Sequence, residues 1–107
     1  MSKIGVTEGF PFDSKTMVWK VGNKMFCLGD IENFDSINLK CDPEKAIELR
    51  AQYTQIQPGF HMSKTHWNTV SFDNLSHQLI NSLIDDSYEL VFNSLTKKTK
   101  ENLTHEL

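Results

Sequence analysis

His61 and His66 lie five residues apart, and their imidazoles are the side chains of this sequence that could bind a metal ion together. Residues with strand-forming character flank Ser63-Lys64, which is a suitable two-residue hairpin loop. With that loop, the two histidines would be cross-strand neighbours on one face of a hairpin, beside Lys64. They could bind a metal ion there, but zinc sites normally need three or four ligands, and no third ligand accompanies them. We therefore expect no metal site.

Other signals for catalysis are missing from the sequence. It has no glycine-rich phosphate loop and no recognisable arrangement of Ser, His and Asp residues. Cys27 and Cys41 lack CxxC or Cys/His spacing, so we interpret both as reduced core residues, with a disulfide or metal role as the alternative. Asp85 and Asp86 would point about 100° apart on a helix, which favours a solvated face. We expect no enzyme and no cofactor.

Positive charge is concentrated in two segments, although the formal net charge is −3. Residues 14–29 contain three lysines and no acid, and residues 49–72 contain one arginine, one lysine and two histidines, also without an acid. Lysines on projecting hairpins could neutralise DNA phosphates, histidines protonated below about pH 6.5 would strengthen this, and an asparagine could contact bases. The predicted nucleic-acid contacts are Lys15, Lys20, Lys24, His61, Lys64, His66 and Asn68.

The clearest hairpin covers Thr16–Leu28, with Gly22-Asn23 as its turn. Regular pairing from this turn would place Trp19 opposite Phe26 and Met17 opposite Leu28. One face would then be apolar and would collect Met17, Trp19, Val21, Phe26 and Leu28. The other would carry Val18, Lys20, Met25 and Cys27.

Two helices are expected to pack on the sheet. After an alternating strand at Ile37–Cys41, Asp42 can cap a helix that has Pro43 at its first position and runs to about Tyr53. It should bury Ala46, Ile47 and Ala51, with Leu49 or Tyr53 as further candidates.

Asn74 can cap the second, longer helix, whose apolar stripe recurs every three or four residues up to Leu95 and ends among lysines. We expect residues 99–107 to be a frayed tail.

Length and hydropathy bound the rest. A chain of 107 residues with 38% hydrophobic content is expected to form one domain over residues 1–107. No apolar run approaches the roughly 18 residues that a membrane span needs, and Met1–Gly5 lacks the apolar core of a signal peptide. We therefore expect a cytoplasmic protein that does not bind membranes.

Several ordered segments resemble the MmcQ/YjbR family of small bacterial proteins. They are Phe10-Pro11-Phe12, Val21-Gly22-Asn23-Lys24-Met25-Phe26, Asn38-Leu39-Lys40-Cys41-Asp42-Pro43, Gln57-Pro58-Gly59-Phe60-His61-Met62, His66-Trp67-Asn68-Thr69-Val70 and Ser87-Tyr88-Glu89-Leu90-Val91. The resemblance implies a fold like that of frataxin and CyaY, and a DNA-binding function through two β-hairpin wings.

The sequence departs from the family at Met1–Thr7, where members usually have a helix of a dozen or more residues. A sheet without that helix would expose apolar area, which favours a homodimer through the face that the missing helix leaves uncovered. Frataxins gather their iron-binding acids in this first helix, so we expect no iron binding.

The sequence thus predicts an α+β domain, an antiparallel β-sheet of hairpins packed by two α-helices, that binds DNA without catalysis. The alternative is a protein-protein interaction module, in which Phe60, Met62 and Trp67 pack under the hairpin or meet a partner. In that interpretation His66 and Asn68 hydrogen-bond buried backbone.

Overall fold

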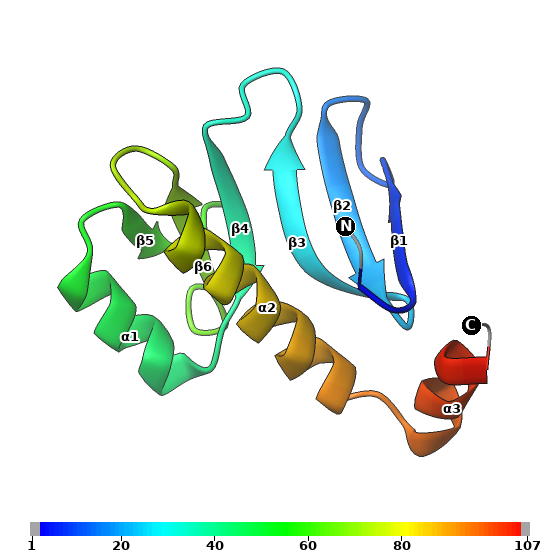
Figure 1. Cartoon of the computed structure of the whole chain (residues 1–107). Coiled ribbons are helices and arrows are strands. Elements are labelled where there is room, and N and C mark those ends of the chain that lie inside the picture. Colours follow the sequence, from blue (N-terminus) through cyan, green and yellow to red (C-terminus); the bar gives the residue numbers. More distant parts are fainter. Residues whose placement is uncertain (1–2, 106–107) are drawn as a thin grey trace.

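A six-stranded antiparallel sheet forms the centre of the computed structural model, which describes residues 3–105 (Figure 1). The strands are β1 (Val6–Gly9), β2 (Thr16–Val21), β3 (Lys24–Asp30), β4 (Ser36–Lys40), β5 (Ile56–Pro58) and β6 (Trp67–Ser71), and their order across the sheet is β1-β2-β3-β4-β6-β5. The helices are α1 (Pro43–Gln52), α2 (His77–Asn93) and α3 (Lys97–His105). The predicted α+β class is confirmed.

Helix α1 begins as its sequence predicts. The side chain of Asp42 accepts a hydrogen bond from the backbone N–H of Lys45, and Pro43 occupies the first turn. Its buried side chains are Ala46 and Leu49. Burial of Ile47 and Ala51 was a wrong prediction, because α1 meets the sheet with a narrow stripe and both residues lie outside it.

Helix α2 is capped by Ser76, whose Oγ accepts from the N–H of Leu79, and not by Asn74. Asn74 has a φ of 58° and belongs to the preceding turn. The helix ends at Asn93, and a separate helix, α3, follows.

The frayed tail was therefore a wrong prediction for residues 99–105, and residues 106–107 lie outside the described part. Two local signals explain α3. Thr96 accepts a hydrogen bond from the N–H of Thr99, in the manner of an N-cap, and Leu103 packs against the core.

The β2–β3 hairpin has the predicted turn, with Val21 opposite Lys24, but its register shifts between Trp19 and Lys20. Lys20 pairs with Met25 and Trp19 with Cys27, so Phe26 is the additional residue of a bulge. Beyond the bulge, each side chain of β3 lies on the face opposite to the one that regular pairing predicts. Cys27 consequently packs in the main core, on the side of the helices, while Leu28 lies on the opposite face, the reverse of the prediction.

The second predicted hairpin is shorter than expected. Strand β5 pairs with β6 only as far as Pro58 opposite Asn68, and residues 59–66 form a loop. The backbone of this loop folds on itself, since Trp67 N–H donates to the Ser63 carbonyl, and His61 has a φ of 59°. The cross-strand pair of His61 and His66 was therefore a wrong prediction.

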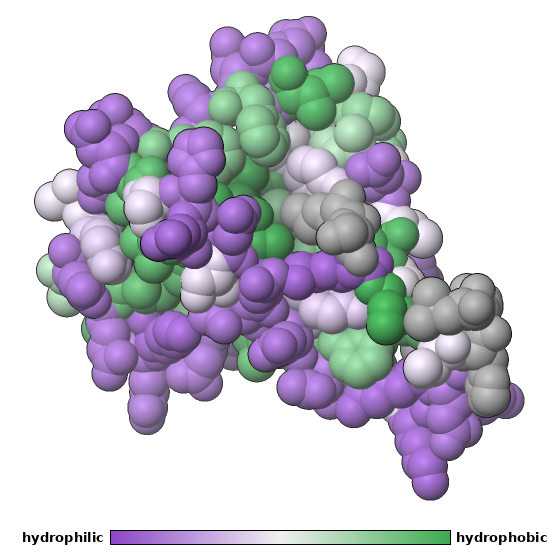
Figure 2. Space-filling model, in the orientation of Figure 1, coloured by the Kyte–Doolittle hydropathy of each residue, from purple (hydrophilic) through white to green (hydrophobic). Residues whose placement is uncertain are grey.

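Helices α1 and α2 cover one face of the sheet and bury the main core against it (Figure 1). Seen from this side, hydrophilic side chains cover much of the two helices, and hydrophobic ones are visible between the helices and near the top of the view (Figure 2). The opposite face, which we call the open face, has no helix over it within residues 3–105. A small second cluster of Val18, Leu28 and Trp67, with Met25 and Met62 against it, lies there.

Candidate functional site

Four lysines and one histidine gather at one end of the sheet. We call this region the basic edge, and its residues are Lys20, Lys24, Lys40, Lys64 and His66. Antiparallel pairing explains why they meet. Lys20 and Lys24 flank the turn between β2 and β3, and Lys40 at the end of β4 pairs with Trp67, directly after Lys64 and His66. Their partners Met25 and Trp67 belong to the second cluster, so Lys20 and Lys40 both point to the open face.

The lysines of the basic edge have no carboxylate partner among the described residues. The ion pairs found in that part of the chain are Lys3–Asp85, Lys15–Glu32 and Lys45–Asp86. Lys24, Lys64 and His66 are exposed, and Lys20 and Lys40 are half-buried. These charges are thus not neutralised within the chain.

Three of the predicted contact residues lie elsewhere. Lys15 precedes β2 at the opposite end of the sheet, where its Nζ lies 3.4 Å from Glu32 Oε2. His61 is exposed in the 59–66 loop, and its ring is tilted by 54° against that of Phe60, with ring centroids 4.1 Å apart. Asn68 is only 2% exposed, so it cannot contact a base, and its inclusion was wrong. Lys40 was not among the predicted contacts, because the only signal in its strand was the alternation of apolar and polar residues.

Arg50, on α1, provides hydrogen bonds to the buried Asn68 and to the backbone next to it. Its Nε donates to Asn68 Oδ1 at 2.6 Å, and a terminal nitrogen donates to the carbonyls of Lys64 and of Trp67. A guanidinium is suited to this, because its donors are held in a planar fork. Asn68 Nδ2 has no hydrogen-bond partner among the described residues. Arg50 therefore links α1, β6 and the 59–66 loop, a positioning role that the sequence did not indicate.

Further hydrogen bonds hold the same loop in place over the open face. Lys64 Nζ donates to the Gly59 carbonyl at 3.0 Å, and the N–H of Phe60 donates to Thr69 Oγ1 at 2.9 Å. Thr69 Oγ1 in turn donates to Asn38 Oδ1. A side chain at position 59 would overlap Trp67, which explains the glycine there. The loop thus presents Phe60, His61 and Lys64 from a defined backbone.

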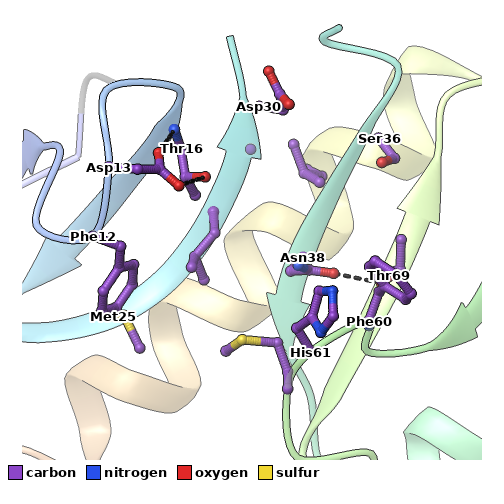
Figure 3. A pocket seen from close by; sticks show the side chains of 14 residues that line it. Phe12, Asp13, Thr16, Met25, Asp30, Ser36, Asn38, Phe60, His61 and Thr69 are labelled. Carbon is purple, nitrogen blue, oxygen red and sulfur yellow. Dashed lines mark hydrogen bonds between the residues drawn. The ribbon is translucent and has the colours of Figure 1, made fainter. Parts of the chain in front are cut away.

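A hollow of about 620 Å³, the open-face groove, lies between this loop and the segment that joins β1 to β2 (Figure 3). Its floor is formed by β2, β3, β4 and β6. The lining side chains that carry the later argument are Phe12, Asp13, Asp30, Phe60, His61 and Met62. Sequence reasoning missed this groove, although two of its segments contain exposed aromatic residues.

The ionisable lining of the groove is two carboxylates and one imidazole, with no lysine or arginine. Asp13 accepts hydrogen bonds from the backbone N–H groups of Thr16 and Lys15, which lower the pKa of its carboxyl below the ordinary 3.8. Charge is therefore distributed unevenly over the open face, with acids at the groove and lysines at the basic edge.

Neither cysteine is placed for nucleophilic chemistry. Burial raises the pKa of the Cys27 thiol to about 12, and burial also raises that of Cys41. Both are free thiols. Within residues 3–105 no three His, Cys, Asp or Glu side chains lie close enough together to hold a metal ion.

Comparisons with known proteins identify the class to which this fold belongs. The YjbR family model matches residues 1–90, and the chain belongs to the YjbR family, as its sequence motifs predicted. Over the described residues, no helix combines the length and apolar character needed to cross a membrane.

Among its relatives are uncharacterised proteins of Escherichia coli. YbdF of strain O157:H7 is 36% identical over 96 residues, which cover 88% of this chain and 79% of YbdF. YjbR of strain K12 is 33% identical over 105 residues, covering 96% of this chain and 89% of YjbR.

Two solved structures are similar. The crystal structure of Deinococcus radiodurans protein DR2400, which has a DUF419 domain, superposes with a TM-score of 0.89 at 37% identity, over 96% of this chain and 80% of that one. A crystal structure of a Pseudomonas syringae protein gives a TM-score of 0.67 at 28% identity, over 80% and 86% of the two chains.

Proposed function

We propose that this protein binds DNA without catalysis, by contacting the phosphate backbone through the basic edge. The observation that carries the proposal is the group of four lysines at one end of the sheet, none of which is paired with a carboxylate in the described part. Phosphate contacts by lysine supply most of the affinity in non-specific binding, because they release condensed counterions.

The spacing of these charges suits a polyanion. Lys20 and Lys40 lie on strands that are separated by β3, and strands are about 4.8 Å apart, so their Cα atoms are on the order of 10 Å from each other. Lys24 begins β3, between these two strands, and Lys64 lies in the loop before β6, on the far side of β4. Side chains on two projections, the β2–β3 turn and the 59–66 loop, can then contact successive phosphates. In this proposal the two projections act as the two wings, the second as a loop in place of the expected β-hairpin.

A net charge of −3 does not oppose this, because local fields decide association. The acids Asp13, Asp30 and Glu32 lie at the other end of the sheet, and would orient the basic edge towards the polyanion. The proposal keeps the cytoplasmic location expected from the sequence, where DNA is accessible.

Fluorescence anisotropy with a random duplex tests the proposal. Four phosphate contacts predict a slope of about −3.6 for log K against log salt, which is roughly a 100-fold loss of affinity between 50 and 200 mM salt. Lys24→Ala and Lys40→Ala should each reduce the slope by about one. The matched control is Lys45→Ala, which removes a lysine that is paired with Asp86 at 2.8 Å on the helical side.

Binding with no salt dependence, or equal losses for Lys24→Ala and Lys45→Ala, would refute the basic edge as the contact surface. Absence of binding at 50 mM salt would favour the alternative expected from the sequence, a protein-protein interaction module. The exposed side chains of Phe12 and Phe60 favour that alternative. Self-association through the surface that the missing N-terminal helix would cover stays a prediction, which a monomeric mass by light scattering at tens of micromolar would contradict.

A further inference from the structure

We propose that the open-face groove is a binding site for a small organic cation, an ammonium or guanidinium group carried on an apolar body. This inference concerns the groove, whose two acids lie at the opposite end of the open face from the basic edge, and does not depend on DNA binding. It rests on the shape, the charge and the aromatic lining of the groove.

The groove has the dimensions of a small-molecule site. Its volume of about 620 Å³ lies within the roughly 300–1,000 Å³ that such sites span. Phe12 approaches from the segment before β2, while Phe60 and His61 lie across the groove from it (Figure 3). Met25 and Leu28 form part of the apolar lining between these walls. A ligand would therefore be enclosed by aromatic rings on two sides and by the sheet beneath.

The charge of the lining selects a cation. Asp13 and Asp30 are the acids of the lining, and His61 is its remaining ionisable group. Lys15 lies near Asp13 but outside the lining, and its Nζ is 3.4 Å from Glu32 Oε2. Phosphate groups of a nucleic acid would meet two carboxylates at this place and be repelled, so the groove is not a continuation of the basic edge. A ligand that brings one positive charge would be attracted by these carboxylates.

Both carboxylates are held by hydrogen bonds within their own turns, and Asp13 Oδ2 also accepts one from Thr16 Oγ1 at 3.2 Å. Asp13 Oδ1 accepts the N–H groups of Lys15 and Thr16, at 2.8 and 2.6 Å. Asp30 Oδ1 accepts those of Glu32 and Asn33, at 2.8 and 3.2 Å. The second oxygen of Asp30 accepts no hydrogen bond from a described residue. Because these turns fix the carboxylates before a ligand arrives, little ordering cost remains for binding.

The aromatic walls provide the apolar part of the site. Phe12 and Phe60 are 65% and 66% exposed, so each presents most of a ring to solvent. Ring faces attract an ammonium or guanidinium group, and ring surfaces bury an apolar body. The His61 ring packs against that of Phe60 at a tilt of 54°. The combination of ring faces and carboxylates is the recognition chemistry of an organic cation.

Three probes that share one aromatic body test the charge preference. Phenethylamine is a cation, phenethyl alcohol is neutral and phenylacetate is an anion. Titrations followed by ¹H–¹⁵N NMR spectra should show shifts for amides around the groove with phenethylamine. Its affinity should exceed that of the alcohol by roughly tenfold, the order expected for one charge pair near a surface, and phenylacetate should not bind.

Two variants separate the charge from the rings. Asp30→Asn keeps an oxygen for the two N–H groups, so the fold is retained, and it should weaken phenethylamine about tenfold while leaving the alcohol unchanged. Phe60→Ala should weaken both. Asp86→Asn, which removes a carboxylate on the helical side, is the matched control and should change neither.

The proposal is overturned if phenylacetate binds as well as phenethylamine, if Asp30→Asn and Asp86→Asn have equal effects, or if millimolar phenethylamine causes no shift in the groove. Binding of a short lysine-containing peptide without binding of phenethylamine would also overturn it, in favour of a peptide site. Loss of DNA binding in the lysine variants leaves these outcomes unaffected, so the two proposals fail separately.

Discussion

Substitution of Arg50 is the sharpest test of how α1 positions the 59–66 loop. Arg50→Ala removes the donors to Asn68 Oδ1, to the Lys64 carbonyl and to the Trp67 carbonyl. Asn68 is 2% exposed and its Nδ2 already has no partner in the described part, so the variant would leave the whole amide unpaired in the interior. Hydrogen bonds to charged groups contribute about 1.5–3 kcal/mol each, and less where water can replace the donor.

We expect Arg50→Ala to lower the free energy of unfolding by about 3 kcal/mol, which corresponds to a fall in Tm of about 10–20 °C for a domain of this size. Urea unfolding followed by tryptophan fluorescence is a suitable assay, because Trp67 lies beside the affected loop. Arg50→Lys should recover less than half of the loss, since one ammonium group cannot reach three acceptors in a planar arrangement.

A double-mutant cycle with Asn68→Ala isolates the central contact. Once Asn68 is an alanine, Arg50→Ala no longer orphans a buried amide, so the two losses should not add, with a coupling of about 1–2 kcal/mol. A loss below about 0.5 kcal/mol for Arg50→Ala, or additive losses in the cycle, would show that the guanidinium does not hold the loop.

Three further predictions concern backbone, thiols and pH. Gly22 has a φ of 55°, and a β-carbon there would overlap a leucine side chain at 2.6 Å. Gly22→Ala should therefore lower the free energy of unfolding, measured in urea, by more than about 1 kcal/mol. Gly9 has open space around it, so Gly9→Ala should lower it by less than half of that. Iodoacetamide should modify half-buried Cys41 in the native protein and spare Cys27, whose burial holds its pKa at about 12; equal labelling by mass spectrometry would contradict this. Backbone N–H groups lower the pKa of Asp13, so the stabilising effect of its carboxylate is complete above the ordinary pKa of 3.8 and is lost as the pH falls through the lowered pKa. Asp13→Asn should therefore lose less stability than the parent protein between pH 5 and pH 2. Parallel profiles of stability against pH for the two proteins would refute this.

Several predictions that depended on neighbouring residues succeeded, although Asn74 was wrongly expected to cap α2. The turn at Gly22-Asn23, the helix start at Asp42-Pro43 and the period of α2 are each determined by residues within one or two turns of the chain. The start of α3 at Thr96 was also local and was missed, because the lysines after Leu95 were interpreted as the end of a longer helix.

Predictions that depended on register failed where one residue changed the pairing. The bulge at Phe26 placed Cys27 and Leu28 on the faces opposite to those expected, because side chains alternate with a period of two. The same sensitivity applies to the 59–66 loop, where the histidine pair required a two-residue turn and the chain formed a longer one.

The sequence by itself determined the family, the fold class and the presence of lysines without nearby acids in two segments. Only the tertiary structure decided which charges meet. Strand pairing gathered Lys20, Lys24, Lys40 and Lys64 at one edge, and placed Lys15 beside Glu32 at the other. The physical reason is that local signals act through backbone geometry over a few residues, whereas a site is assembled by contacts between segments that are distant in the chain.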